Sequence, residues 1–225
     1  MFTDRLFEKT STIWEKYLEH PFVKEIGKGS LDLDKFQFFM EQDYLYLIDY
    51  CKVFALGSAK ASRLEVMTIF SDLLHSTLNE EMELHRQYAE KLGMTRTQLE
   101  NSTPSSTLSA YTSYMLQKSY QGSEADVAAS VLACTWSYNF IGLNLAQTEG
   151  ATEHPFYGDW INMYASDEFS QLASQMKQLM NELAEEKPER EKAELEAIFV
   201  HCSKLEYLFW DMAYDKQMWP QEISS

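Results

Sequence analysis

The sequence contains few residues that break helices and few that could form cross-links. Its 225 residues include 8 Gly, 5 Pro and 3 Cys. The low Gly and Pro content excludes collagen-like and low-complexity chains, and the aromatic share of 14% excludes a disordered chain. The three cysteines show no Cys-x-x-Cys spacing, so the sequence encodes neither a disulfide framework nor a zinc knuckle. We therefore expect a folded protein with reduced thiols.

Long apolar runs and basic patches are also missing. No segment approaches the roughly 20 apolar residues that span a bilayer, and residues 1–5 are too polar for a signal peptide. The 19 Lys plus Arg against 35 Asp plus Glu give a formal charge of −16, and the Lys-rich segment 187–192 is interleaved with Glu. Such a surface repels phosphate backbones and anionic lipids. The composition predicts a cytoplasmic protein that binds neither nucleic acid nor membrane.

The chain does contain a series of apolar patterns with the spacing of α-helices. Gly and Pro fall between these stretches, and neither a linker nor an internal repeat divides them. The pattern predicts a single all-α domain over residues 1–225, a bundle of seven to eight helices. The expected long helices cover residues 3–19, 34–61, 65–92, 106–120, 123–147, 166–186 and 188–218, and a loop from His154 leads into a short helix that ends near Tyr164.

Two polar positions on otherwise apolar helix faces are candidates for chemistry. Cys134 and Tyr138 lie one turn apart on the same face, where Cys134 is either a buried core thiol or part of a functional site. Glu206 has Cys202 one turn before it and Phe209 one turn after it. It lies either at a helix edge in water or in an aromatic cleft. In a cleft, desolvation would raise its pKa and make it a proton donor near neutral pH.

A third candidate is a stripe formed by Asp43, Tyr46 and Tyr50 on the helix expected over residues 34–61. Buried tyrosine hydroxyls beside an aspartate imply a polar network. The network either satisfies itself or holds a ligand, and tyrosines are suited to enclosing a flat heterocycle.

The sequence gives little indication of a metal site. A di-iron bundle needs two Glu-x-x-His pairs, and the nearest match is Asp72-x-x-His75. His20 has the position of a haem ligand, but Pro21 is expected to end the helix there. We interpret Glu81 and His85, one turn apart, as a surface pair. We therefore expect no metal and no cofactor.

Six short motifs follow one another along nearly the whole chain. They are Trp14 with His20-Pro-Phe-Val, Phe38-Phe-Met-Glu-Gln-Asp43-Tyr-Leu-Tyr46, Cys134-x-x-x-Tyr138, His154-Pro-Phe-Tyr, Trp160-Ile-x-x-Tyr164 and Glu206-x-x-Phe209-Trp210. Each is weak alone, but together they resemble the TenA, or thiaminase II, family. The resemblance implies a haem-oxygenase-like all-α fold without haem, assembled as a homotetramer in the cytoplasm.

The activity that this resemblance implies is aminopyrimidine aminohydrolase, which acts in thiamin salvage. Water replaces the amine on the exocyclic methylene of 4-amino-5-aminomethyl-2-methylpyrimidine, and thiamin itself is also cleaved. Another class of function remains open, a pyrimidine-binding or regulatory protein of the same fold that does not turn its ligand over.

The resemblance also implies roles for individual residues. It makes Cys134 the nucleophile, Glu206 the proton donor and Tyr46 the hydroxyl beside the thiol. Cys134 lies about three turns into its helix, beyond the reach of the helix dipole. We therefore expect Tyr46 to donate a hydrogen bond to the sulfur and the thiolate to form mainly when substrate is bound. The implied substrate-binding residues are Asp43, Tyr111, Tyr138, Tyr164 and Phe209.

Overall fold

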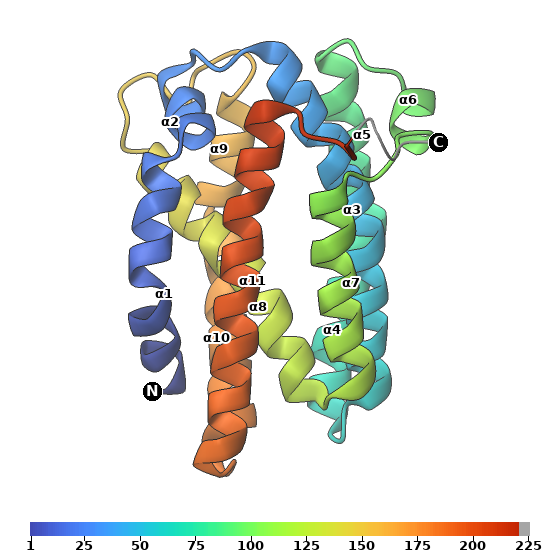
Figure 1. The fold of residues 1–225 in the computed structure, drawn as a ribbon, viewed down its shortest axis with the longest axis vertical. Coiled ribbons are helices and arrows are strands. Elements are labelled where there is room, and N and C mark those ends of the chain that lie inside the picture. The colour runs from blue at the N-terminus through green and yellow to red at the C-terminus, as the bar shows by residue number, and fades with distance from the viewer. Residues whose placement is uncertain (221–225) are drawn as a thin grey trace.

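A computed structural model describes residues 1–220, and regular secondary structure within this range is entirely helical (Figure 1). The all-α prediction is therefore confirmed. The predicted domain extends to residue 225, and residues 221–225 lie outside the described part. The helices are α1 (Phe2–Glu19), α2 (Pro21–Lys28), α3 (Leu33–Lys60), α4 (Leu64–Ser76), the π-helical turn η1 (Thr77–Glu81), α5 (Met82–Lys91), α6 (Arg96–Glu100), α7 (Ser106–Gln121), α8 (Glu124–Leu145), α9 (Gly158–Ala165), α10 (Asp167–Glu185) and α11 (Glu189–Asp215).

The number of α-helices in the described range, eleven, is higher than predicted, because local features subdivide the expected elements. Pro21 ends α1, but it also begins α2, since proline is favoured in the first turn of a helix. The helix expected over residues 65–92 is continuous but consists of α4, η1 and α5. The π-helical turn corresponds to one interval of five residues between the buried Thr77 and Met82, whereas the buried residues on either side recur every three or four.

Helix α8 is the element around which the others pack. It contacts α3, α7, α9, α10 and α11. Small residues such as Ala128, Ala129 and Ala133 let these neighbours approach, and they are fully buried. A helix that is buried on every side is apolar all round. In Figure 1, α8 crosses the bundle between the long helices α10 and α11 and the pair α3 and α7.

His20 joins three helices. Its Nδ1 accepts a hydrogen bond from the backbone N–H of Phe22 at 3.1 Å and so caps α2. Its Nε2 lies 2.9 Å from Oδ1 of Asp211 on α11. Both ring nitrogens of the histidine that was considered as a haem ligand are thus engaged within the protein.

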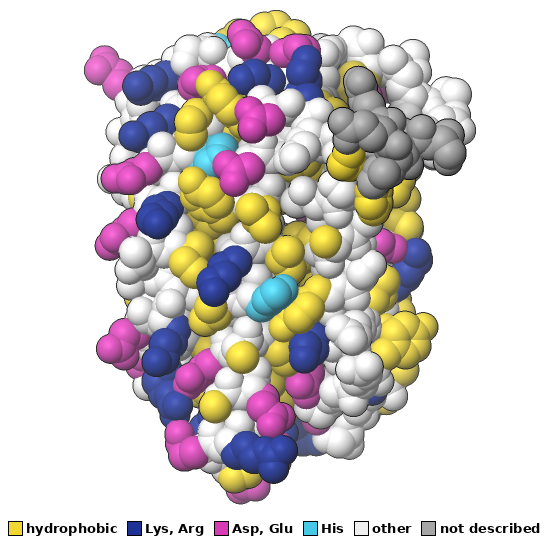
Figure 2. Space-filling model, in the orientation of Figure 1, with side chains coloured by type: hydrophobic (Ala, Val, Ile, Leu, Met, Phe, Trp, Pro, Cys, Tyr) yellow, Lys and Arg dark blue, Asp and Glu magenta, His cyan; other side chains and the backbone are white. Residues whose placement is uncertain are grey.

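The surface in Figure 2 mixes acidic and basic side chains with hydrophobic ones, and no continuous basic patch covers this face. Among the helices of residues 1–220, none has the length and apolar character needed to cross a membrane.

Helices α8 and α9 lie close together at Gly142. A Cβ atom at this position would lie 2.6 Å from the backbone carbonyl carbon of Tyr164. One turn earlier, Nδ2 of Asn139 donates to the carbonyl oxygen of Tyr164 at 3.0 Å. A glycine and an asparagine on α8 therefore fix the position of the Tyr164 backbone.

We expect Gly142→Ala to lower the free energy of unfolding by about 1–3 kcal/mol, because backbone atoms cannot yield to the added methyl group. The matched control is Gly27→Ala in α2, where the new Cβ would meet Cδ2 of Leu145 at 2.9 Å, the end of a flexible side chain. Urea unfolding of both variants measures the difference. An equal or smaller loss in Gly142→Ala would contradict this account.

Candidate active site

A small, largely enclosed cavity of about 40 Å³ lies between α3, α8, α9, α10 and the segment from α4 to η1. Its lining includes neither Lys nor Arg. A larger groove of about 820 Å³ lies at the surface beside the N-terminus, but it contains none of the predicted site residues. Those that line the enclosed cavity are Asp43, Tyr46, Cys134, Tyr138 and Tyr164.

The other three predicted residues lie directly behind this wall. Tyr111 on α7 donates from Oη to Oε1 of Glu206 at 2.6 Å. Glu206 in turn is hydrogen-bonded to Cys134, which lines the cavity. The ring of Phe209, one turn further along α11, lies 6.2 Å from the ring of Tyr46. The structure thus brings all eight predicted residues together.

Glu206 is buried, with 2% of its surface exposed, so the alternative of a carboxylate in water is wrong. Burial raises its pKa to about 7. Hydrogen bonds from Tyr111 and Cys134 lower the pKa in part, and the charge of Asp43 raises it. A carboxyl group with this pKa can both donate and accept a proton near neutral pH.

Cys134 is partly exposed, whereas Cys51 and Cys202 are buried. Burial within the protein raises the pKa of the Cys134 thiol well above its ordinary value, and the charge of Glu206 adds to this effect. The interaction with Tyr46 acts in the opposite direction, and the Tyr46 hydroxyl donates to Sδ of Met115 at 3.6 Å, so its hydrogen bond to the sulfur of Cys134 stays a prediction. The thiol is therefore neutral at physiological pH.

The structure adds a residue that sequence reasoning missed. His85 on α5 is 3% exposed, and its Nε2 lies 2.7 Å from Oδ2 of Asp43. The prediction of a surface pair with Glu81 is wrong. The signal was present in the sequence, because Met82, His85 and Ala89 are spaced i, i+3 and i+7 and form the buried face of α5.

Burial and partners act in opposite directions on His85. Burial lowers the pKa of its imidazole, but the hydrogen bond and the charge of Asp43 outweigh this effect and leave the pKa raised. Across residues 1–220, no group of three or more His, Cys, Asp and Glu side chains is arranged to hold a metal ion.

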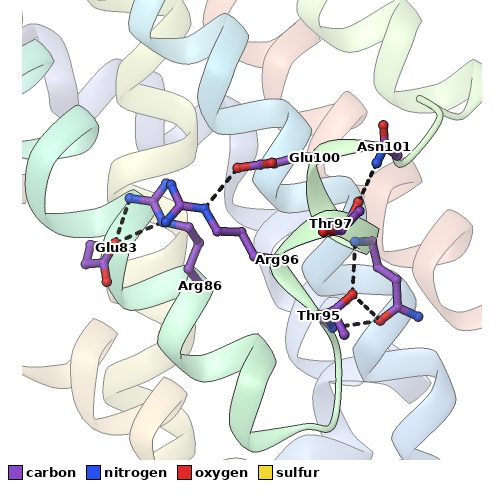
Figure 3. A network of polar contacts seen from close by, with 8 residues as sticks. Glu83, Arg86, Thr95, Arg96, Thr97, Glu100 and Asn101 are labelled. Carbon is purple, nitrogen blue, oxygen red and sulfur yellow. Dashed lines mark hydrogen bonds and ion pairs between the residues drawn. The ribbon is translucent and has the colours of Figure 1, made fainter.

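The outer face of α5 is held by exposed polar contacts (Figure 3). Nε of Arg86 donates to Glu83 at 2.9 Å, and Arg96 beside it makes an equivalent contact with Glu100 on α6. Exposed ion pairs contribute at most about 1 kcal/mol each. The buried contact between His85 and Asp43 is therefore the stronger constraint on how α5 faces α3.

The π-helical turn η1 forms one edge of the cavity. Thr77 and Glu81, its first and last residues, both line the cavity. Burial raises the pKa of Glu81 to about 6, although the nearby His85 lowers it in part. Single π-helical turns inside longer helices occur frequently at functional sites.

The model of the TENA/THI-4/PQQC family matches residues 8–216. The chain belongs to this family. The expected TenA resemblance is thereby confirmed. An "aminopyrimidine aminohydrolase" of Halalkalibacterium halodurans is 54% identical over 218 residues, which cover 97% of each chain.

Solved structures support the same family and its fold. A TenA homologue from P. horikoshii matches with a TM-score of 0.88 and 28% identity over 96% of this chain and 99% of that one. A domain from Shewanella denitrificans, described as having a heme oxygenase-like fold, matches with a TM-score of 0.79 and 15% identity over 95% of this chain and 92% of that one. The predicted haem-oxygenase-like fold class is confirmed.

The raised pKa of Glu206 makes stability depend on pH. The folded state keeps its proton up to about pH 7, whereas the unfolded state loses it near the ordinary pKa of 4.5. The contribution of protonated Glu206 to the free energy of unfolding is thus complete below about pH 4.5 and is lost as the pH rises from 4.5 to about 7. Between pH 5 and pH 8 this loss amounts to about 2.5 kcal/mol of unfolding free energy, and we expect Glu206→Gln to abolish it. Urea unfolding tests this, with exposed Glu168→Gln as the control that keeps the slope of the parent protein.

The raised pKa of Cys134 predicts slow alkylation of the free protein. The rate of reaction with iodoacetamide should keep rising with pH and show no plateau below about pH 9, since the thiolate is the reactive form. Cys134→Ser measures the background from Cys51 and Cys202. A thiol that titrates near pH 5 would contradict the assignment of a neutral resting thiol.

Proposed function

We propose that the protein is an aminopyrimidine aminohydrolase of the thiaminase II type. It hydrolyses 4-amino-5-aminomethyl-2-methylpyrimidine to the 5-hydroxymethyl compound and ammonia, and it also cleaves thiamin, in a salvage pathway. The name and the 54% identity of the Halalkalibacterium halodurans relative support this substrate class. The tyrosine-lined cavity supports it independently, because flat heterocycles bind between aromatic side chains.

One observation carries the proposal. A thiol from α8, a carboxyl group from α11 and an aspartate from α3 meet at one enclosed cavity. Cys134 and Asp43 line it, and Glu206 reaches it through its hydrogen bond to Cys134. These are the three functions that the displacement of an amine from a pyrimidine methylene requires.

Asp43 recognises the ring. Its carboxylate accepts a hydrogen bond from the exocyclic amino group or from a protonated ring nitrogen of the substrate. Either interaction makes the ring a better acceptor of electrons. Tyr138 and Tyr164, whose rings lie 4.8 Å apart, form the aromatic wall beside it.

Cys134 is the nucleophile. An aminopyrimidine is electron-poor, so the sulfur can add to a ring carbon, and the electrons pushed into the ring then expel the group on the neighbouring methylene. Covalent addition splits one difficult displacement into two easier steps. Water adds next to the methylene, and the thiol leaves.

Glu206 moves the protons at the leaving group. It takes the proton of Cys134 through their hydrogen bond as the sulfur adds, and it gives that proton to the departing amine. The same carboxylate then takes a proton from the attacking water. A pKa of about 7 suits both directions of transfer.

The resemblance also implies a cytoplasmic location and a homotetramer, and both stay predictions. The alternative of a protein that binds pyrimidine without turnover predicts affinity for the ring and no release of ammonia.

Steady-state ammonia release from the aminomethylpyrimidine and from thiamin tests the proposal. We expect turnover in the parent protein and none in Cys134→Ser, because a serine hydroxyl is a much weaker nucleophile. Glu206→Gln should lower kcat by a factor of about 100 to 10,000. The control is Cys51→Ala, which removes a thiol that does not line the cavity and should leave kcat unchanged. Binding without ammonia release in the parent protein would favour the regulatory alternative.

A further inference from the structure

Asp43 and His85 form a buried pair that separates two cavities. Asp43 lines the enclosed cavity of about 40 Å³, whereas His85 lines a second one of about 200 Å³. Their side chains are 7% and 4% exposed and meet at 2.7 Å. His85 does not line the enclosed cavity, and its side chain meets the lining of that cavity at the carboxylate of Asp43.

The second cavity shows what else faces His85. It lies between α3, α5 and α9, with apolar walls from Met40, Trp160 and Met163. Its charged lining groups are Lys91 and Asp159, which form an ion pair with each other at 2.7 Å. Within residues 1–220, the charged groups that act on the imidazole are Asp43 from α3 and Glu81 from η1.

The hydrogen bonds of His85 define its protonation. The imidazole is hydrogen-bonded to the backbone carbonyl of Glu81 as well as to Asp43. A carbonyl oxygen only accepts hydrogen bonds, so the ring nitrogen that faces it carries a hydrogen. The remaining nitrogen, Nε2, faces a carboxylate. At 2.7 Å, one hydrogen lies between Nε2 and Oδ2 of Asp43, and the raised pKa of His85 favours its position on the imidazole.

We propose that His85 is a positioning residue that holds the proton which Asp43 passes to a nitrogen of the pyrimidine ring when Cys134 adds. This inference rests on the proposed function, and it adds a source for the proton that the ring needs. Without such a proton the negative charge of the attacked ring would develop inside a cavity whose lining has no Lys or Arg.

The addition step balances as follows. A bond forms between Sγ of Cys134 and a ring carbon, and the electron pair of the double bond at that carbon moves through the ring to a nitrogen. That nitrogen takes a proton from Asp43, which receives the proton on Nε2 of His85. The hydrogen of the thiol passes to Glu206.

The expulsion step returns the ring proton to His85. The electron pair of the ring N–H bond forms a C=N bond, the adjacent C=C bond becomes an exocyclic C=CH₂ bond, and the bond from methylene to amine breaks. The amine leaves with the hydrogen held by Glu206 as ammonia. The ring proton returns through Asp43 to His85, so the pair is ready for the addition of water.

The first test compares His85→Gln with the parent protein and with His75→Gln, a change at an exposed histidine. Glutamine can donate a hydrogen bond to Asp43, but it has no proton to give between pH 5 and pH 9. We expect KM to stay within about threefold and kcat to fall by a factor of about 100 or more, while His75→Gln keeps the activity of the parent protein. A kcat within about threefold of the parent protein would overturn the proposal.

A second test separates proton donation from shape. His85→Ala enlarges the cavity of about 200 Å³, and added imidazole or pyrazole can occupy the space. The two have the same shape, but only imidazole is protonated near neutral pH. We expect imidazole to restore kcat, more strongly at lower pH, and pyrazole not to restore it. Equal rescue by both would show a structural role and overturn the proposal.

A third measurement needs no variant and covers the case in which the variants do not fold. Nitrogen-15 NMR of the parent protein at pH 7 should show both ring nitrogens of His85 carrying hydrogen, and His85 should titrate above the ordinary histidine pKa of 6.5. A bare Nε2 at pH 7 would overturn the inference. Absence of turnover in the parent protein would instead reject the proposed function and leave this NMR result unaffected.

Discussion

The burial of acidic groups at one small cavity without basic side chains is the constraint on which the site depends. Neither Lys nor Arg lines it. Desolvation therefore acts on the acidic groups without a compensating cation. The pKa of Glu206 rises to about 7, and that of Cys134 rises well above its ordinary value. The thiol is consequently not activated in advance by its surroundings. Its activation has to accompany the arrival of the electron-poor ring and the transfer of its proton to Glu206.

The imidazole of His85 is the one positive partner that the fold brings to Asp43 within the described structure, and its position depends on helix geometry. Helices α4 and α5 are continuous through η1, whose wider turn changes the register between them. One residue of register corresponds to about 100° of rotation around an α-helix. The π-helical turn therefore decides which face of α5 is directed at α3. Together with the close approach at Gly142, it sets the two walls that face each other across the cavity.

The sequence predicted the helical class and most long elements because apolar residues recur with a helical period, as in α3 and α11. Five of the eight site residues stood out first as polar positions on apolar helix faces, namely Asp43, Tyr46, Cys134, Tyr138 and Glu206. The resemblance in motifs gave roles to all eight, and the structure places them together. The π-helical turn was missed because it alters a single interval, the five residues from Thr77 to Met82, and Thr77 is not apolar. Helix α2 was missed because proline both ends one helix and begins another. His85 was misjudged because a buried histidine needs a partner far away in sequence, and Asp43 lies 42 residues earlier.

The edge of the cavity that η1 forms is connected to the imidazole of His85. The cavity volume of about 40 Å³ has room for about three water molecules. The walls from α3 and α8 belong to the hydrophobic core, whereas η1 exposes Leu78, Asn79 and Glu80 between its lining residues. A displacement of η1 also moves the carbonyl of Glu81, which is hydrogen-bonded to His85. The position of η1 is thus coupled to the imidazole that Asp43 contacts.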